Sequence, residues 1–232
     1  MNDNKNNIYI DELTKIISNI KCNKIKNIYF NLQNSEIIIR NLQNIKINKK
    51  QEIVKLIKYE IGDHMDLNLQ NYIIKYKKII NNNIESSIQG ILFPKKYVDI
   101  CNSISKNIKI KNKHLYINFD ILQKLIDLKF IELSQIKNTK ITIIENREND
   151  IIINSIINKT IIDSYCIDKN NNEYFIKQLL YDNDTYYYGI NDDFISKLQI
   201  QKLRFKKQLI MHNNDNMEDI TIQYISSLGM VI

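Results

Sequence analysis

The chain has 232 residues, of which 44% are hydrophobic and 25% are charged, as in an ordinary globular protein. Asparagine, isoleucine and lysine dominate, which is typical of a compositional bias and warns against assigning function to runs of these residues. The formal net charge is +7, but 26 acidic residues are interleaved with the lysines and no run of four basic residues occurs. The composition therefore does not favour a nucleic-acid-binding protein.

The cysteines, histidines and apolar segments exclude several further classes. Neither the three cysteines nor the three histidines have the spacing of metal ligands, and the cysteines form no disulfide pattern, so we expect no metal and a reducing compartment. No apolar run approaches the roughly 18 residues that a membrane-spanning helix needs. Residues 1–7 are polar and lack the apolar centre of a signal peptide. We expect a cytoplasmic protein.

The first third of the chain predicts a helix and two strands. Apolar residues at helical spacing predict a helix over residues 11–20. Alternating apolar and polar residues predict a strand over residues 25–32, and a second strand follows over residues 36–40. The turn at Asn34 and Ser35 between them favours a hairpin.

The next segment predicts a small unit of two helices and two strands. A helix over residues 49–61 follows the good N-cap Asn48, and Gly62 is predicted to end it. A strand over residues 69–80 and a second over residues 87–93 come next, and Pro94 opens a helix that reaches residue 107. On the first of these strands, alternation directs Tyr72, Ile74 and Tyr76 to one face.

The remaining elements follow the same local patterns. A strand is predicted over residues 115–119 and a helix over residues 119–128. Strands over residues 140–144 and 150–157 form a predicted hairpin, and another strand covers residues 160–167. Three helices are then predicted, over residues 173–180, 192–211 and 217–228.

The order of the elements over residues 36–117 resembles the inserted subdomain, with its flanks, of PilM-type pilus-assembly proteins, which are actin-like relatives of FtsA. In that family, a strand and a chain reversal lead to a strand that ends in arginine, as residues 28–32 and Arg40 do here. The family's next helix carries a glutamate near its end, which Glu60 matches. The isoleucine-proline that usually follows this helix is absent, and His64 stands there instead.

Later elements extend the resemblance. The family's tyrosine-containing strand is matched at Tyr72, and the strand that runs into a helix start is matched at Pro94. Residues 117–121 look like a leucine-aspartate-isoleucine segment, residues 139–157 resemble the hairpin of the second domain, and residues 227–230 are similar to the glycine-containing end of the terminal helix. No single motif is specific, so the ordered succession carries the resemblance.

The resemblance implies an α/β fold, a reduced actin-like (ribonuclease H-like) arrangement with an inserted small αβ subdomain. We expect a first actin-like subdomain over residues 8–130, with the insertion at about residues 41–110, and a second, degenerate one over residues 131–232. It further implies a non-catalytic cytoplasmic adaptor of a type IV pilus or related secretion assembly. Its partners would be the cytoplasmic N-terminal segment of a PilN-like bitopic membrane protein and other pilus assembly proteins, so membrane contact would be indirect.

The departures from the family argue against nucleotide binding. An actin-like ATPase needs glycine-rich hairpins whose amides approach the phosphates. The first such hairpin has no counterpart here, and residues 132–135, where the second would fall, hold no glycine. Residues 208–217, where the family has an adenine-side glycine pair, hold none either. We expect no cofactor and no enzymatic activity.

The candidate partner-binding residues are Arg40, Tyr72, Ile74 and Tyr76. Tyrosines offer a large contact area with few rotatable bonds, and an arginine can pair with a carboxylate or with peptide carbonyls. The competing interpretation is that these tyrosines simply cover the neighbouring helix. Two other functions stay open: an FtsA-like nucleotide-dependent, membrane-associated filament protein, which the missing glycines disfavour, and a nucleic-acid-binding protein, which the missing basic patch disfavours.

Overall fold

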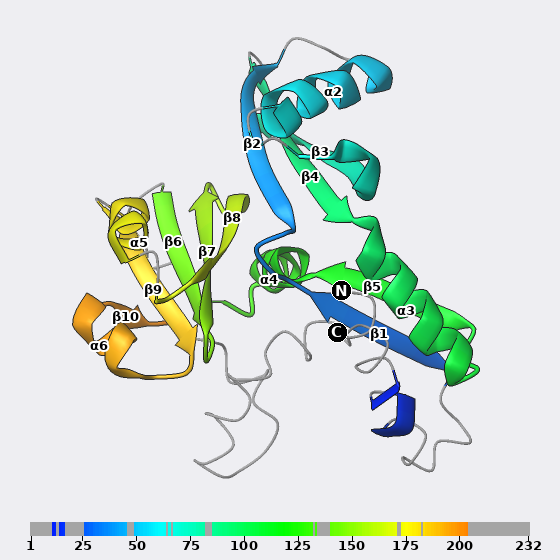
Figure 1. The fold of residues 1–232 in the computed structure, drawn as a ribbon. Helices are drawn as coiled ribbons and strands as arrows, with labels where there is room; N and C mark the ends of the chain where they lie inside the picture. Colours follow the sequence, from blue (N-terminus) through cyan, green and yellow to red (C-terminus); the bar gives the residue numbers. More distant parts are fainter. Residues whose placement is uncertain are drawn as a thin grey trace.

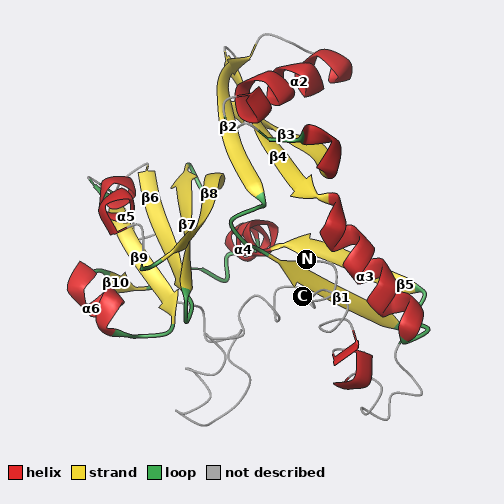
Figure 2. Cartoon of the chain, viewed as in Figure 1, coloured by secondary structure: helices red, strands yellow, loops and turns green. Residues whose placement is uncertain are grey.

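The computed structural model describes residues 11–12, 14–16, 26–45, 49–63, 65, 67–81, 85–131, 133, 140–170, 173–181 and 183–203. Its strands form two sheets, and its helices lie on both faces of the larger one (Figures 1 and 2). The fold is α/β, as the sequence predicts.

The larger sheet has eight strands in the order β10-β9-β6-β7-β8-β2-β4-β3. All neighbouring pairs are antiparallel except β9 with β6 and β9 with β10, which are parallel. In chain order the strands are β2 (Ile38–Ile45), β3 (Tyr72–Asn81), β4 (Glu85–Pro94), β6 (Lys140–Asn146), β7 (Asp150–Ile157), β8 (Thr160–Asp168), β9 (Asp184–Gly189) and β10 (Gln201–Lys202).

The second sheet corrects the predicted hairpin over residues 25–40. β1 (Asn27–Leu32) pairs in parallel with β5 (Asn112–Ile117), and β2 belongs to the other sheet. Parallel strands require a long crossover, here the whole insertion, and a local alternation pattern carries no signal for so distant a partner. The turn at Asn34 and Ser35 therefore leads from one sheet to the other.

The inserted unit packs one helical segment on β2, β4 and β3 (Figure 1). α2 (Lys50–Ile57) continues as a π-helix (Lys58–Asp63), so Gly62 does not end the helical segment as predicted. A short 3-10 helix (Leu69–Asn71) then precedes β3. The buried cluster contains isoleucines of the helix and apolar residues of the sheet, namely Ile38, Ile53, Ile57, Ile61, Ile88 and Leu92.

α3 (Lys95–Asn107) and α4 (Asn118–Asp127) flank the central core. Within α4, five apolar side chains are buried against residues of both β2 and β6, because apolar positions recur on one face: Phe119, Ile121, Leu122, Leu125 and Ile126. Ile57 is fully buried, whereas Val98 on α3 is half-buried.

At the other end of the large sheet, α5 (Glu173–Leu180) and α6 (Asp193–Leu198) cover the face opposite α4. The helix predicted over residues 192–211 is wrong at residues 199–203, and residues 204–211 lie outside the described residues. Gln199 adopts a left-handed conformation (φ 52°), which ends α6, and β10 follows at once. The helix predicted over residues 217–228 and the segment 227–230 lie outside the described residues.

A narrow junction joins the inserted unit to the rest of the large sheet. β2 and β8 are paired only at Ile39 and Ser164 among the described residues. Side chains strengthen the junction: the buried Gln89 amide donates to the carbonyls of Ile161 and Ile162, each at 2.9 Å, and Asp163 accepts from the backbone N–H of Asn41 at 2.9 Å. The boundary between the two predicted actin-like subdomains, at residue 131, stays a prediction.

Candidate partner-binding site

The four predicted binding residues come from two strands that flank β4. In the register, Arg40 and Tyr76 both lie opposite Gly90, and Ile74 lies opposite Leu92. Cross-strand partners project from the same face of a sheet. The structure therefore brings all four residues to the face that α2 covers.

Gly90 lets the helix approach the strand between Arg40 and Tyr76. A Cβ atom at this position would lie 3.0 Å from Cδ1 of Ile61 and 3.2 Å from Cγ2 of Ile57. The side chains of Ile57 and Ile61 thus pack directly against the backbone of β4 at Gly90. This close approach leaves the side chains of β3 at the rim of the cluster.

Tyr72, Ile74 and Tyr76 are half-buried and pack against the isoleucine cluster of α2. They cover the helix layer, as the competing interpretation expects. Each also keeps part of its side chain exposed, because β3 is the last strand of the sheet. The binding role of these three residues stays a prediction.

Arg40 is engaged at the junction. Its Nη1 donates to the carbonyl of Ile39 at 2.8 Å, and its guanidinium lies over the ring of Tyr165 on β8. Burial raises the pKa of the nearby Asp163 carboxyl, although the charge of Arg40 and the bond from Asn41 act in the opposite direction. Arg40 therefore links β2 to β8, and its role in binding a partner stays a prediction.

A second polar group fixes the turn that precedes β2. The Glu36 carboxylate accepts from Lys96 at 2.6 Å and from the Tyr97 hydroxyl at 2.7 Å, and Asn34 donates to that hydroxyl at 2.6 Å. Partial burial raises the pKa of Glu36, but the bonds from Lys96 and Tyr97 outweigh it and hold the pKa below its ordinary value. The turn is thereby attached to the start of α3.

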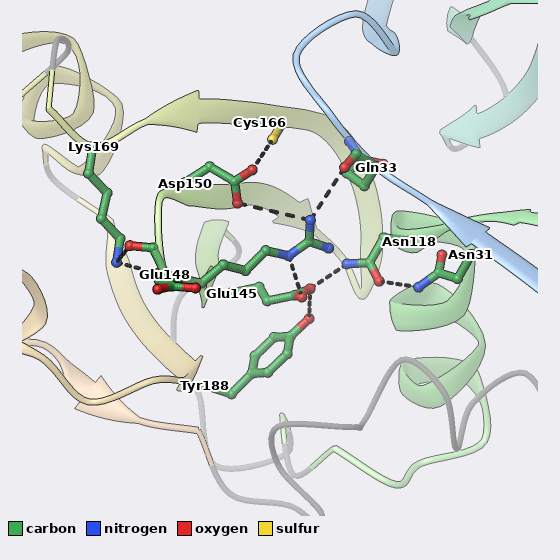
Figure 3. Close-up of polar contacts among 10 residues, drawn as sticks. Asn31, Gln33, Asn118, Glu145, Glu148, Asp150, Cys166, Lys169 and Tyr188 are labelled. Atoms are coloured by element: carbon green, nitrogen blue, oxygen red, sulfur yellow. Dashed lines mark hydrogen bonds and ion pairs between the residues drawn. The ribbon is translucent and has the colours of Figure 1, made fainter. Parts of the chain in front are cut away.

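The sequence gives no hint of the polar network in Figure 3, which surrounds Glu145 at the end of β6. The Glu145 carboxylate accepts from the Asn118 amide, from the Tyr188 hydroxyl at 2.8 Å and from Nε of Arg147 at 2.8 Å. Asn31 of β1 donates to Asn118 at 3.0 Å. The network joins β1, α4, β6 and β9, which only the folded chain brings together.

Arg147 extends this network across the β6–β7 turn. Nη1 donates to the carbonyl of Gln33 at 3.3 Å and lies 4.0 Å from Asp150. Burial lowers the pKa of Arg147, but Glu145 and Asp150 outweigh it, so the guanidinium stays charged. Burial, together with Asp150, raises the pKa of Cys166 to about 12, so its thiol is protonated and a poor nucleophile. These groups hold two parts of the fold together, and nothing in them resembles an activated nucleophile with its base.

No protein-family model and no curated protein matches the sequence. Solved structures do match the fold. A chain of the "PilM-PilN type IV pilus biogenesis complex" superposes with a TM-score of 0.65 at 7% identity, covering 95% of this chain and 82% of that one. The cytoplasmic domain of EpsL, an inner membrane component of the type II secretion system of Vibrio cholerae, superposes with a TM-score of 0.53 at 8% identity, covering 96% and 81%. The chain has a PilM-like fold.

This likeness confirms the predicted fold class, a reduced actin-like arrangement with an inserted αβ unit. A protein from Bacteroides thetaiotaomicron with an actin-like ATPase fold and unknown function is more distant, with a TM-score of 0.43 at 15% identity, covering 90% and 80%. Among the described residues, no helix is both long enough and apolar enough to cross a membrane.

Proposed function

We propose that the chain is a non-catalytic cytoplasmic adaptor of a type IV pilus or related secretion assembly. It binds the cytoplasmic N-terminal segment of a PilN-like bitopic protein, and through that partner it lies at the inner face of the membrane. The observation that supports this proposal is the superposition of nearly the whole chain on a chain of a PilM–PilN complex.

The inserted unit offers a surface suited to a short extended segment. Tyr72, Ile74 and Tyr76 present partly exposed apolar area in a row along one strand, backed by the buried cluster of α2. Anchors of this kind, held by a packed core, bind with little loss of side-chain entropy. Backbone pairing and alternate side-chain contacts are the usual means by which extended peptides are recognised.

We also propose that the chain does not bind a nucleotide. Residues 147–149, which connect β6 to β7, contain no glycine whose amide could approach a phosphate closely. Arg147 in this turn already forms bonds with Glu145 and with the carbonyl of Gln33. We therefore expect no saturable heat when Mg-ATP at millimolar concentration is titrated into the protein.

The partner is tested by binding measurements with a panel of synthetic N-terminal segments of bitopic membrane proteins. At least one segment should bind saturably, and a scrambled version of it should not. Saturable ATP binding with a micromolar dissociation constant, together with no binding to any segment, would replace this proposal with an FtsA-like nucleotide-dependent one.

A further inference from the structure

The outer edge of β3 is the feature that carries a further inference. Within the part of the chain that the structure describes, β3 pairs with β4 along all ten of its residues and with no other strand. An edge strand of this kind directs a row of backbone N–H and C=O groups away from the sheet. Such a row is a template for another extended segment.

The two flanks of this edge differ in chemistry. On the flank that faces α2, the first three side chains, Tyr72, Ile74 and Tyr76, are half-buried and mainly apolar, and the exposed Lys78 follows them. On the opposite flank, the exposed Lys75 and Lys77 lie between the half-buried Ile73 and the buried Ile79. Neither lysine forms an ion pair with a described residue, although Asp120 of α4 lies close enough to Lys77 for their charges to interact.

We propose that a partner segment adds to the edge of β3 as a further strand, with apolar residues on the α2 flank and aspartate or glutamate on the other. Because side chains alternate along a strand, each acidic residue would lie beside Lys75 or Lys77 while its neighbours contact Tyr72, Ile74 and Tyr76. This inference rests on the proposed adaptor function and names the pattern of the segment: alternating apolar and acidic residues.

Charge distinguishes this occupant from a second copy of the chain. Pairing two β3 strands edge to edge would bring the lysines of both copies together, and like charges on neighbouring strands are destabilising. An acidic segment removes that repulsion. Edge lysines also discourage indiscriminate pairing, so they favour a partner that carries the complementary charge.

The test uses a labelled peptide of about eight residues in which valine and glutamate alternate. Its binding to the full chain is measured. Three peptides serve as comparisons: the same composition with the valines and glutamates in separate blocks, the alternating peptide with lysine in place of glutamate, and the alternating valine-glutamate peptide with every second amide N-methylated. The variant is K75E/K77E, and the matched control is K95E/K106E, which makes the same charge change at exposed positions of α3.

We expect the alternating valine-glutamate peptide to bind more tightly than the block and N-methylated peptides. In K75E/K77E its affinity should fall by about tenfold, and the valine-lysine peptide should bind instead, because two ion pairs change sign. K95E/K106E should behave like the parent. Equal binding of the alternating and block peptides, or equal loss in both double variants, would overturn the proposal.

The same variant separates this inference from the adaptor function. A natural bitopic segment that binds the parent and K75E/K77E equally would leave the adaptor function standing and exclude β3 as its site. The absence of binding by every segment and every designed peptide would overturn both. Circular dichroism of the two double variants should match the parent, because all four lysines are exposed.

Discussion

The guanidinium carbon of Arg40 lies 4.3 Å from the centroid of the Tyr165 ring, across the junction of β2 and β8. Arg40→Ala should lower the free energy of unfolding by about 1 kcal/mol, because a partly desolvated cation–π contact is lost. Arg40→Lys should recover part of that stability, since it keeps the charge but not the planar group. Urea unfolding of both variants, alone and combined with Tyr165→Leu, gives the coupling energy between the two side chains. In the Tyr165→Leu background, the part of the Arg40→Ala effect that comes from the ring contact should vanish.

Gln89 offers a second test of this junction. Its side chain is only 1% exposed, and its amide donates to two carbonyls of β8. Gln89→Ala should lower the free energy of unfolding by about 2–4 kcal/mol, because both carbonyls lose a buried donor and a cavity remains. Gln51→Ala, at an exposed position of α2, should change it by less than about 0.5 kcal/mol. If denaturant titrations showed equal losses of stability for Gln89→Ala and Gln51→Ala, Gln89 would not stabilise the junction.

Two alanine substitutions test the faces of α2 and α3. Ile57 is fully buried in the α2 cluster, so Ile57→Ala should lower the free energy of unfolding by about 2–5 kcal/mol. Val98 is half-buried, so Val98→Ala should lower the free energy of unfolding by only roughly 1 kcal/mol. Thermal and denaturant unfolding should rank the two in this order. A larger loss at Val98 would mean that α3 packs more tightly than its exposure indicates.

The pair formed by Lys169 and Asp192 predicts a pH dependence at the start of α6. Partial burial raises the pKa of Asp192, but the bonds from Lys169, at 2.7 Å, and from the N–H of Ile195 outweigh it and lower the pKa. The lowered pKa stabilises the fold above the ordinary value of about 4, and this contribution is lost as the pH falls through the folded-state value. Asp192→Asn keeps the N-cap and removes the charge, so the stability difference between parent and variant should shrink below pH 4.

The binding role of the β3 tyrosines is tested by truncation. Tyr76→Ala or Tyr72→Ala should weaken the binding of a PilN-like segment by roughly 2 kcal/mol or more, the size expected of a hot spot. Isothermal titration measures the affinity, and far-UV circular dichroism checks the fold. Because both side chains also pack against α2, a modest loss of melting temperature is expected. A loss of binding that only mirrors a loss of folded protein would show that the tyrosines act as core residues alone.

Local patterns predict most of the elements of this fold. The alternation that directs Tyr72, Ile74 and Tyr76 to one face is confirmed by their common contact with the α2 cluster. Pro94 does precede α3, because its fixed φ suits the beginning of a helix. Such features depend on neighbours within a few residues, so the sequence alone contains them.

The errors arise where distant residues decide the outcome. The pairing of Asn27 with Asn112 depends on the whole intervening insertion, whereas the local pattern favours a hairpin between β1 and β2. The helical pattern over residues 192–211 hid the left-handed Gln199, which ends α6. The sequence does not predict the network of Glu145 for a similar reason, because Asn31, Asn118 and Tyr188 are far apart in the chain and share no motif.

Among the described residues, Ile39 and Ser164 form the one ladder pair between β2 and β8, and this has a mechanical consequence. In a sheet pulled across its strands, every row bears the same load, so the row with the fewest backbone bonds yields first. Among the described strands, that row lies between the inserted unit and β8. The side chains of Gln89, Arg40 and Asp163 share the load there, so they set the force at which the two parts separate. Under tension across the sheet, the inserted unit should therefore separate from β8 before either part unfolds.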